Sequence, residues 1–215
     1  MLVYLLGFAE SYNADRKVAD WVVYHLTREK VGSSGAERSE DFRPDPELAP
    51  DSRAELSDYR GKGFDRGHLA PAGDMQWSEQ AMSESFLLSN MAPQVGVGFN
   101  RGIWKNLEEK VRDWARSRGE LYIMTGPIYI GDRIDTIGTH RVAVPTHFYK
   151  VVFDPVRVEA ITFIMPNMKL QSSDLPRYIT SVDAVEFMTD LDFLSELEDT
   201  VEAVVEGKLQ VGVWE

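Results

Sequence analysis

The stretch Tyr59-Arg-Gly-Lys-Gly-Phe-Asp-Arg-Gly-His68 carries more information about fold and chemistry than any other part of this chain. It places a candidate base, His68, next to a permanent cation, Arg66. His68 lies two positions after Arg66, so on an extended segment both side chains point to the same face. Gly67 between them allows a sharp turn or a close approach of the backbone. We expect Asp65, which points the opposite way, to anchor the turn rather than to bind a ligand.

The composition around this stretch is that of an ordinary folded protein. The chain has 215 residues, of which 43% are hydrophobic and 27% charged, enough for one large domain. It has no cysteine, which excludes disulfides, thiolate zinc sites and a cysteine nucleophile. No apolar run is long enough to span a membrane, and residues 1–8 lack the marks of a signal peptide. The sequence does not determine the cellular compartment, and a secreted or periplasmic location is favoured only if a signal peptide has been removed.

The net charge of −12 argues against a protein that binds nucleic acid without sequence preference. The distribution weakens that objection. Residues 53–118 contain ten Lys/Arg and nine Asp/Glu, and are therefore near +1, whereas residues 178–207 contain no basic residue. We interpret the acidic residues as a solvated rear face, away from the motif. An aid to solubility is the ordinary explanation of such runs.

Periodicity predicts mixed secondary structure. β-Branched and aromatic runs predict strands over residues 20–27, 86–89, 121–130 (broken at Gly126-Pro127), 147–153 and 158–164. Helices are expected over residues 78–86, with Ser78 as the cap, over 101–116, which have an apolar stripe, and as short segments within 181–206. Residues 32–57 read as a long loop. We predict a single α+β domain over residues 1–215.

The motif residues suit the hydrolysis of a phosphodiester, which needs a base for water and a cation for the growing charge. His68 can be the base, because neutral imidazole is available near pH 7. A lone histidine is more often a buried structural residue, but the Asp-Arg-Gly context favours the base. Arg66 presents a fork-shaped cation suited to phosphate oxygens. Its alternative is an ion pair with Asp65 or Asp58.

Two residues near the helix of residues 101–116, Asn100 and Glu108, are candidates for a metal site. Asn100 offers an amide oxygen acceptable to Mg²⁺, although an asparagine at a helix start is normally an N-cap. The row Asn100, Trp104, Glu108, Arg112 follows one helix ridge. Glu108 could hold a metal-bound water. Its alternative is a solvated salt bridge with Arg112, four residues on.

Three blocks of sequence together resemble a known family. They are residues 58–74 (DYRGKGFDRGHLAPAGD), 89–94 (SNMAPQ) and 99–108 (FNRGIWKNLE). Their order and spacing are similar to those of the DNA/RNA non-specific endonucleases, the group of Serratia-type nucleases and mitochondrial endonuclease G. Weaker similarity runs from about Gly7 to Leu197. The resemblance implies a ββα-metal (His-Me finger) nuclease fold, with a central, mostly antiparallel sheet flanked by helices.

The resemblance also implies catalytic roles. In the family pattern His68 activates the attacking water, Asn90 orients or supports His68, and Arg66 contacts the phosphate. The substrates implied are both DNA and RNA, because members of the family read the backbone rather than the bases. Their products carry 5′-phosphate and 3′-hydroxyl ends. A phosphodiesterase or pyrophosphatase for small nucleotide diesters is the alternative on the same fold, and a nuclease-like scaffold that only binds is a third hypothesis.

The implied cofactor is a single Mg²⁺, for which Mn²⁺ substitutes, bound through Asn100 and waters. Glu108, helped by Arg112, would support the metal waters, and Arg112 would contact substrate. Serratia-type members also carry a second phosphate-contacting arginine upstream of the motif. Here Arg38 and Arg43 lie in that region beside an acidic pair, and the sequence assigns the role to neither. A homodimer and an inhibitor or immunity protein are partners that the resemblance suggests and no residue argues for.

Overall fold

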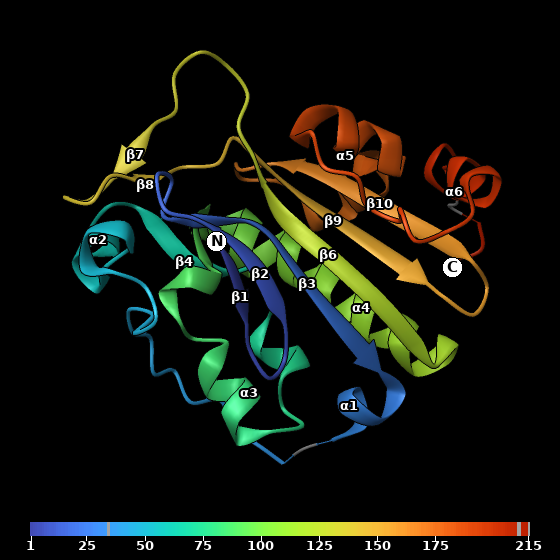
Figure 1. The fold of residues 1–215 in the computed structure, drawn as a ribbon, viewed down its shortest axis with the longest axis horizontal. Helices are drawn as coiled ribbons and strands as arrows, with labels where there is room; N and C mark the ends of the chain where they lie inside the picture. The colour runs from blue at the N-terminus through green and yellow to red at the C-terminus, as the bar shows by residue number, and fades with distance from the viewer. Residues whose placement is uncertain (34, 210–211, 215) are drawn as a thin grey trace.

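The computed structural model describes residues 1–33, 35–209 and 212–214, and its centre is a seven-stranded antiparallel sheet (Figure 1). The strand order is β1-β2-β3-β6-β9-β10-β11. The strands are β1 (Leu2–Tyr4), β2 (Ala9–Asn13), β3 (Val18–Thr27), β6 (Glu120–Ile128), β9 (His147–Asp154), β10 (Glu159–Pro166) and β11 (Ile179–Thr180). The predicted α+β class with a mostly antiparallel central sheet is confirmed.

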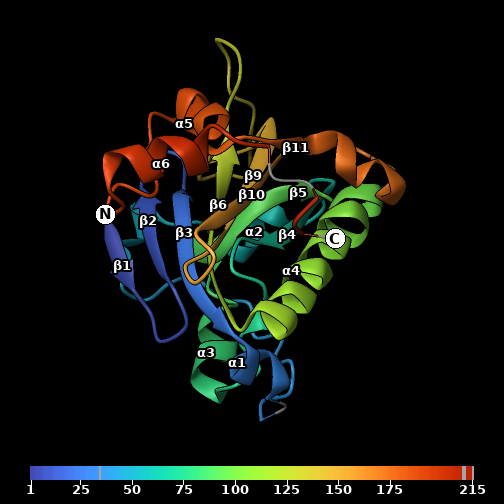
Figure 2. The ribbon, with the colours of Figure 1, turned by 90° about the vertical axis from the view of Figure 1, so that its right-hand side faces the viewer.

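Helices cover both faces of this sheet. The long helix α4 (Lys105–Arg118) packs on one face, and α5 (Val182–Thr189) and α6 (Asp199–Glu206) pack on the other (Figure 2). The alternation of strand β9 shows why. Phe148 and Val152 join the core that contains Leu107 of α4, whereas Tyr149 joins the core that contains Val182 of α5. The chain therefore has two apolar layers, one on each side of the sheet.

The motif forms one strand of a separate two-stranded sheet. Strand β4 (Phe64–His68) pairs antiparallel with β5 (Met91–Val95), and the chain then leads into α4. This β4–β5–α4 unit is the ββα arrangement that the resemblance implied. Gly67 is required here by space, because a Cβ at this position would lie 2.2 Å from Gln94 Cδ on the paired strand.

The remaining elements are short. They are α1 (Arg28–Gly32), α2 (Leu56–Tyr59), α3 (Glu79–Glu84), the pair β7 (Thr136–Ile137) and β8 (Val142–Ala143), and 3-10 turns at Pro50–Ser52, Ala72–Asp74, Leu88–Asn90 and Ser172–Tyr178. The predicted cap of α3 is confirmed, since Ser78 Oγ accepts a hydrogen bond from the backbone N–H of Ala81. The expected loop of residues 32–57 is largely irregular, although position 34 lies outside the described residues. Among the helices described, none is long and apolar enough to cross a bilayer.

The predicted strand over residues 86–89 is wrong. Leu88–Asn90 is a 3-10 turn, and the strand β5 begins only at Met91. The apolar run suggested a strand because Phe86 and Leu88 are core residues, with 0% and 1% of their surfaces exposed. Burial alone does not distinguish a strand from a turn inside a core.

The predicted break of the strand over residues 121–130 at Gly126-Pro127 is also wrong, because β6 continues to Ile128. A proline inside a sheet removes a backbone donor and is tolerated only where no partner needs it. Strand β3 pairs with β6 as far as Thr125, while β9 pairs with it through Ile128. Pro127 therefore lies beyond the part of β6 that pairs on both sides.

Helix α4 starts at Lys105, four residues later than the predicted start at residue 101. The preceding segment Gly96–Trp104 is a wide, irregular turn, in which Arg101 has φ −90° and ψ 19° and Gly102 has φ −137° and ψ −112°. Asn100 is therefore not the N-cap of α4. The proposed ridge from Asn100 to Arg112 is interrupted before Trp104, so any meeting of Asn100 with Glu108 depends on tertiary structure.

Candidate active site

A cleft of about 710 Å³ opens where the β4–β5–α4 unit meets the upstream loop. It gathers five of the six residues that the sequence singles out, and Asn90 lies outside its lining. The lining consists of Arg38, Phe42, Leu56, Tyr59, Arg60, Phe64, Asp65, Arg66, His68, Pro71, Ala72, Gly73, Asn100, Arg101, Lys105, Glu108 and Arg112. Six of these side chains are cationic and two are acidic. The cleft is thus electropositive although the chain as a whole is acidic.

The imidazole of His68 is held by two aromatic rings. Its centroid lies 5.0 Å from that of Phe86, edge to face, and 5.7 Å from that of Phe42. Nε2 is covered by protein and has no hydrogen-bond partner, which leaves Nδ1 as the nitrogen able to receive a proton from a molecule in the cleft. Burial lowers the pKa of His68 to about 3, and the nearby guanidinium groups of Arg38 and Arg66 add to the effect. His68 is therefore neutral at pH 7.

Asn90 lies beneath the cleft and is fully buried. Its Oδ1 accepts from the backbone N–H of Ala70 at 2.8 Å, and its Nδ2 donates to the carbonyls of Ala70 at 2.9 Å and Ser85 at 2.8 Å. The backbone N–H of Leu69 also donates to the Asn90 carbonyl at 3.0 Å. The side chain therefore fastens the backbone that follows His68 rather than the imidazole itself. Such an arrangement suits a supporting group more than one that meets substrate.

The guanidinium of Arg66 is not neutralised by either of the carboxylates that were its alternative partners. Asp58 pairs with His140, at 2.9 Å between Oδ2 and Nδ1, and Asp65 points into the segment 96–104. The Arg66 guanidinium carbon instead lies 3.9 Å from the ring centroid of Phe42. Within the described residues no carboxylate pairs with Arg66, so its charge is available to an anion in the cleft. The predicted alternative, an ion pair with Asp65 or Asp58, is wrong.

Asp65 fixes the orientation of Asn100. Its Oδ2 accepts a hydrogen bond from Asn100 Nδ2 at 2.9 Å and pairs with Arg101 Nε at 3.0 Å. Because the amide nitrogen is occupied, the oxygen of Asn100 is the end of the amide left for a ligand in the cleft. Asp65 thus anchors its neighbours, as expected, and the amide oxygen is the atom that a hard cation would bind.

Arg112 does not pair with Glu108, so the predicted salt bridge between them is wrong. Arg112 Nη1 binds Asp74 Oδ1 at 2.8 Å instead, and the other oxygen of Asp74 accepts from the hydroxyl of Tyr24 at 2.8 Å. Glu108 lines the cleft, and burial raises the pKa of its carboxyl above the usual range, with Lys150 opposing the rise. The Glu108 carboxyl group therefore lies at the boundary between the cleft and the interior.

These donors fit a single hard divalent cation. An oriented amide oxygen on Asn100 and a carboxylate on Glu108 line the same cleft, and both are oxygen ligands of the kind that Mg²⁺ or Mn²⁺ accepts directly or through water. The small number of acids leaves room for waters and a phosphate around such an ion. The surrounding cations would hold the remaining phosphate oxygens.

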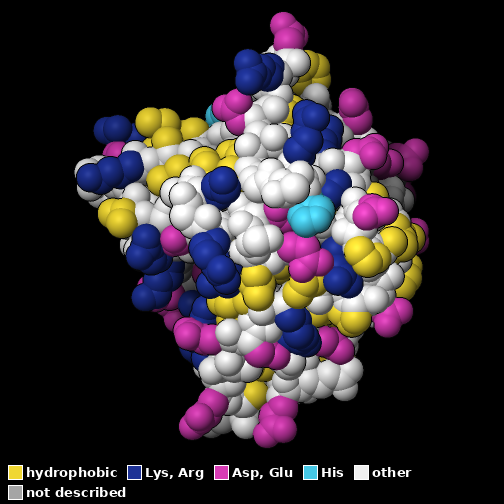
Figure 3. Space-filling model, turned by 90° about the vertical axis from the view of Figure 1, so that its left-hand side faces the viewer, with side chains coloured by type: hydrophobic (Ala, Val, Ile, Leu, Met, Phe, Trp, Pro, Cys, Tyr) yellow, Lys and Arg dark blue, Asp and Glu magenta, His cyan; other side chains and the backbone are white. Residues whose placement is uncertain are grey.

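The structure also separates two arginines that the sequence leaves undecided. Arg38 lines the cleft, and its guanidinium carbon lies 5.0 Å from the ring centroid of Phe86. Arg43 Nη1 binds Asp41 at 2.7 Å and the carbonyl of Ser83 at 2.9 Å, outside the cleft lining. The space-filling view of the face that carries α2 shows Lys and Arg interspersed with Asp and Glu rather than a continuous basic surface (Figure 3). The positive charge is therefore concentrated locally in the cleft.

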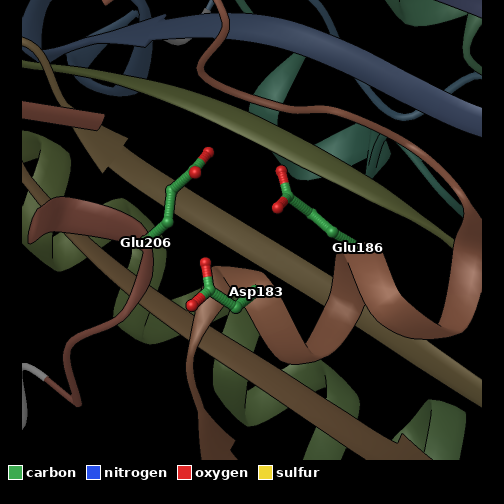
Figure 4. Close-up of side chains that lie close together, drawn as sticks. All are labelled: Asp183, Glu186 and Glu206. Carbon is green, nitrogen blue, oxygen red and sulfur yellow. The ribbon is translucent and has the colours of Figure 1, made fainter. Parts of the chain in front are cut away.

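A second group of carboxylates lies elsewhere. Asp183 and Glu186 of α5 and Glu206 of α6 bring carboxylate oxygens within 4.8 Å of one another (Figure 4). Helices α5 and α6 cover the sheet face opposite α4, so this cluster is not part of the cleft. Burial and the neighbouring Glu186 raise the pKa of Glu206 to about 8. Glu206 is thus protonated at neutral pH, which weakens the cluster as a cation site.

Comparison with known proteins agrees with this geometry. The family model described as DNA/RNA non-specific endonuclease matches residues 3–200. Nuclease C1 of Cunninghamella echinulata var. echinulata is 38% identical over 206 residues, covering 89% of this chain and 82% of the relative. Human mitochondrial endonuclease G is 37% identical, covering 86% of this chain and 67% of the relative.

Solved structures give the same result. A crystal structure described as the EndoG/EndoGI complex superimposes with a TM-score of 0.87 at 34% identity, covering 92% of this chain and 87% of that chain. Sequence and fold similarity thus extend over nearly the whole molecule and include the cleft. The chain belongs to the DNA/RNA non-specific endonuclease family and is a nuclease, a hydrolase of nucleic-acid phosphodiester bonds.

Proposed function

We propose that this protein is a Mg²⁺-dependent, sugar-non-specific endonuclease that cuts DNA and RNA to 5′-phosphate and 3′-hydroxyl ends, with His68 as general base. One observation carries the proposal. A neutral imidazole, an unpaired guanidinium on Arg66 and an oriented amide oxygen on Asn100 line the same cleft. Those are the groups needed to deprotonate water, hold a phosphate and hold a hard cation.

In the proposed reaction Nδ1 of His68 takes a proton from a water that attacks phosphorus in line with the leaving 3′ oxygen. Arg66 binds a non-bridging phosphate oxygen and stabilises the charge that grows there. Asn100 would hold a divalent cation, which would supply Lewis-acid stabilisation of the negative charge that develops in the reaction. The bond between phosphorus and the 3′ oxygen breaks, the leaving oxygen takes a proton from solvent and becomes a 3′-hydroxyl, and the phosphate stays on the 5′ oxygen of the downstream nucleotide.

The low pKa of His68 in the free protein suits this role once substrate is bound. Burial and the guanidinium groups of Arg38 and Arg66 keep the imidazole neutral, so it is ready to accept a proton. A phosphate in the cleft would offset those two cations and make the imidazole a stronger base. The site therefore avoids protonation before substrate arrives and gains basicity when it does.

The lack of preference for sugar or base follows from the kind of contacts that the cleft offers. Its lining contains six cationic side chains, which suit phosphate oxygens rather than base edges. A site that holds the backbone by charge accepts DNA and RNA alike. This supports the broad substrate range over a phosphodiesterase or pyrophosphatase restricted to small nucleotide diesters.

The decisive experiment compares cleavage of plasmid DNA and RNA by the wild type and His68→Ala, each with Mg²⁺ and with EDTA. We expect metal-dependent cutting of both polymers and a loss of about 10²–10⁴-fold in kcat/KM in the variant, the usual contribution of a general base. His25→Ala is the control, because His25 pairs with Glu120 at 2.8 Å outside the cleft. Normal cleavage by His68→Ala would show that His68 is not the base.

The products and alternative substrates are read in the same assay. Ligation of the fragments without phosphatase or kinase treatment would support 5′-phosphate and 3′-hydroxyl ends. Faster turnover of a small chromogenic diester than of plasmid would favour the phosphodiesterase alternative. Binding without turnover at every metal concentration would favour the scaffold.

Two partners are part of the proposal. We infer that a protein inhibitor could occupy the electropositive cleft through acidic side chains, because the cleft is built for anions. The structural relative is described together with an inhibitor of that protein. A homodimer is the second, and sedimentation of the purified chain tests it directly.

A further inference from the structure

An asparagine that lies outside the cleft lining joins the two sheets of the molecule. Asn167 directly follows β10, and its half-buried side-chain amide reaches β5. There its Oδ1 accepts from the backbone N–H of Val95 at 2.9 Å, and its Nδ2 donates to the carbonyl of Pro93 at 3.0 Å. Nδ2 also donates to the carbonyl of Pro145, just ahead of β9, at 3.0 Å. One amide therefore bonds three backbone groups from two segments that are distant in the sequence.

The two bonds to β5 take the place of a neighbouring strand. Within the described residues β5 pairs with β4 on one edge and with no strand on the other. Pro93 and Val95 flank Gln94, which pairs with Asp65 of β4. The amide of Asn167 thus bonds the free edge of β5 as a peptide group of an adjacent strand would. Without it, one backbone donor and one backbone acceptor at this edge would lose their partner.

Asn167 is itself fixed to the seven-stranded sheet. Its backbone N–H donates to the carbonyl of Thr146 at 2.8 Å. The residue before it, Pro166, is the last of β10 and lies opposite His147 of β9. Strands β9 and β10 therefore set the position of the amide. Its bonds to β5 align the two-stranded sheet of the motif with the large sheet.

Val95 is the last residue before the segment that carries Asn100. The irregular segment Gly96–Trp104 begins directly after Val95, and Asn100 lies within it. Asp65 of β4 holds the amide nitrogen of Asn100 at 2.9 Å. The segment is therefore attached at its start through Asn167 and at Asn100 through Asp65.

The residues that follow Asn167 support the same segment. Gly98 has φ 89°, a value that other residues rarely adopt. A Cβ at this position would lie 2.6 Å from Lys169 Cγ and 3.3 Å from the carbonyl oxygen of Leu170. The turn thus packs directly against residues 169–170. This contact is independent of the bond to Val95, and both contacts place the segment 96–104 against residues 167–170.

We propose that Asn167 is a positioning residue of the nuclease site, whose amide fixes the start of the segment 96–104 and thereby the place at which the Asn100 amide oxygen faces the cleft. Asn167 does not line the cleft, and it acts through the backbone of Val95 rather than on substrate or metal. The inference rests on the proposed function for the metal-binding role of Asn100, whereas the hold on the segment can be tested with no metal present.

The metal-free test is hydrogen exchange of the wild type and Asn167→Ala in EDTA. We expect the backbone N–H groups of residues 97–104, none of which bonds Asn167, to exchange about tenfold faster in the variant, because local opening of the segment costs less free energy once its start is released. Exchange at the wild-type rate over residues 97–104 would overturn the proposal.

The matched control is Asn13→Ala. Asn13 lies outside the cleft lining, and its side chain also bonds backbone groups, with Oδ1 accepting from the N–H of Asp15 at 3.1 Å and of Arg16 at 3.0 Å. This variant should lower the urea midpoint of unfolding, as Asn167→Ala does, but leave exchange over residues 97–104 unchanged. Equal acceleration there in both variants would show a general loss of stability and would contradict the proposal.

Binding of Mn²⁺, measured by calorimetry without nucleic acid, tests the consequence for the metal. The binding event that disappears in Asn100→Ala identifies the site. We expect its dissociation constant to rise about tenfold in Asn167→Ala, the lower end of the effect of residues that orient a metal ligand, and to stay unchanged in Asn13→Ala. A wild-type dissociation constant in Asn167→Ala would show that Asn167 does not position the ligand.

Plasmid cleavage at increasing Mg²⁺ concentration separates positioning from damage to the fold. A displaced ligand should raise the Mg²⁺ concentration for half-maximal rate about tenfold in Asn167→Ala, while saturating Mg²⁺ restores most of kcat. A loss by the same factor at every Mg²⁺ concentration would contradict the proposal. Should Asn167→Ala fail to fold, Asn167→Asp keeps the shape, cannot donate to Pro93 and Pro145, and carries the same comparisons.

The two kinds of failure are distinguishable. Absence of cleavage by the wild type, or retention of every Mn²⁺ binding event by Asn100→Ala, would count against the proposed function. The exchange of residues 97–104 in EDTA then decides by itself whether Asn167 holds the segment.

Discussion

At the scale of single residues, the motif is constrained by space as much as by chemistry. Gly67 separates His68, the proposed base, from the cation of Arg66, and the three lie on one short strand. The side chain of Gln94 crosses directly over Gly67 and is itself fully buried. Arg66 and His68 share one face of β4 because side chains alternate along a strand, and at Gly67 the opposite face is occupied by Gln94.

This predicts the effect of Gly67→Ala. The new Cβ would lie 2.2 Å from Gln94 Cδ, so either the buried Gln94 side chain or its strand must shift, at a cost of about 1–3 kcal/mol in the free energy of unfolding, and we expect a loss of activity as β4 adjusts. Gln94→Ala in the same protein creates the missing room and should restore part of both. Urea unfolding and plasmid cleavage measure the two effects. A second substitution that rescues neither would show that space is not the reason for this glycine.

The residues of the candidate site differed in how well the sequence could predict them. Arg66, His68 and Asn100 stand in motifs with fixed spacing and could be predicted. Arg38 could not, because it comes from an irregular loop, where no periodicity indicates which way a side chain points.

At the scale of elements, α4 connects the cleft to the interior through one ion pair. Arg112 is 17% exposed and binds the fully buried Asp74. Arg112→Ala would leave that carboxylate buried without its partner, so we expect the free energy of unfolding to fall by about 3 kcal/mol. Arg116→Ala is the control on the same helix, because its pair with Asp113 is exposed, with side chains 51% and 72% accessible. Its cost should stay below about 1 kcal/mol. Equal losses in the free energy of unfolding for the two variants, measured by urea titration, would contradict this prediction.

Elements with a strong hydrophobic periodicity could be predicted from the sequence. Elements whose bounds depend on contacts with neighbouring segments could not. The strands β3, β9 and β10 and the helices α3, α5 and α6 follow their sequence patterns closely. The unbroken β6 depends on which neighbour reaches Pro127, which is a property of the sheet and not of the strand. The late start of α4 depends on the backbone of Arg101 and Gly102, in a segment whose side chains still look helical. The strands β1 and β2 are short and carried too weak a pattern to be predicted.

At the scale of the whole molecule, charge is sorted between the two sides of the sheet. The cleft on the α4 side is lined mainly by cations, whereas residues 178–207, which include α5 and α6 on the other side, contain no basic residue. The interpretation of the acids as a rear face therefore agrees with the fold. An acidic protein can thus present a local positive field to a polyanion while its remaining surface stays negative. The expectation of a single domain over residues 1–215 stays a prediction.

A buried glutamate makes the stability of the folded protein depend on pH. Glu10 of β2 is fully buried, and neither carboxylate oxygen has a partner. Burial raises the pKa of Glu10 to about 8, with the nearby Ser89 hydroxyl opposing the rise and Asp45 adding to it. The unfolded chain releases this proton near pH 4.5, the ordinary value for glutamate, so between pH 4.5 and 8 the folded state binds one more proton than the unfolded state. The free energy of unfolding should therefore fall as pH rises through this window.

Glu10→Gln tests this, because glutamine keeps the shape and removes the titration. In the wild type Glu10 contributes a slope of about −1.4 kcal/mol per pH unit to the free energy of unfolding between these limits, and the variant should lose that contribution. It should consequently be more stable than the wild type at pH 8, with the difference shrinking toward pH 5. Glu47→Gln in the exposed loop is the matched control and should leave the slope unchanged. Parallel urea titrations of the three proteins from pH 5 to 9 decide the matter: a variant whose stability runs parallel to the wild type would show that Glu10 is charged in the folded protein, and that an unseen partner offsets its burial.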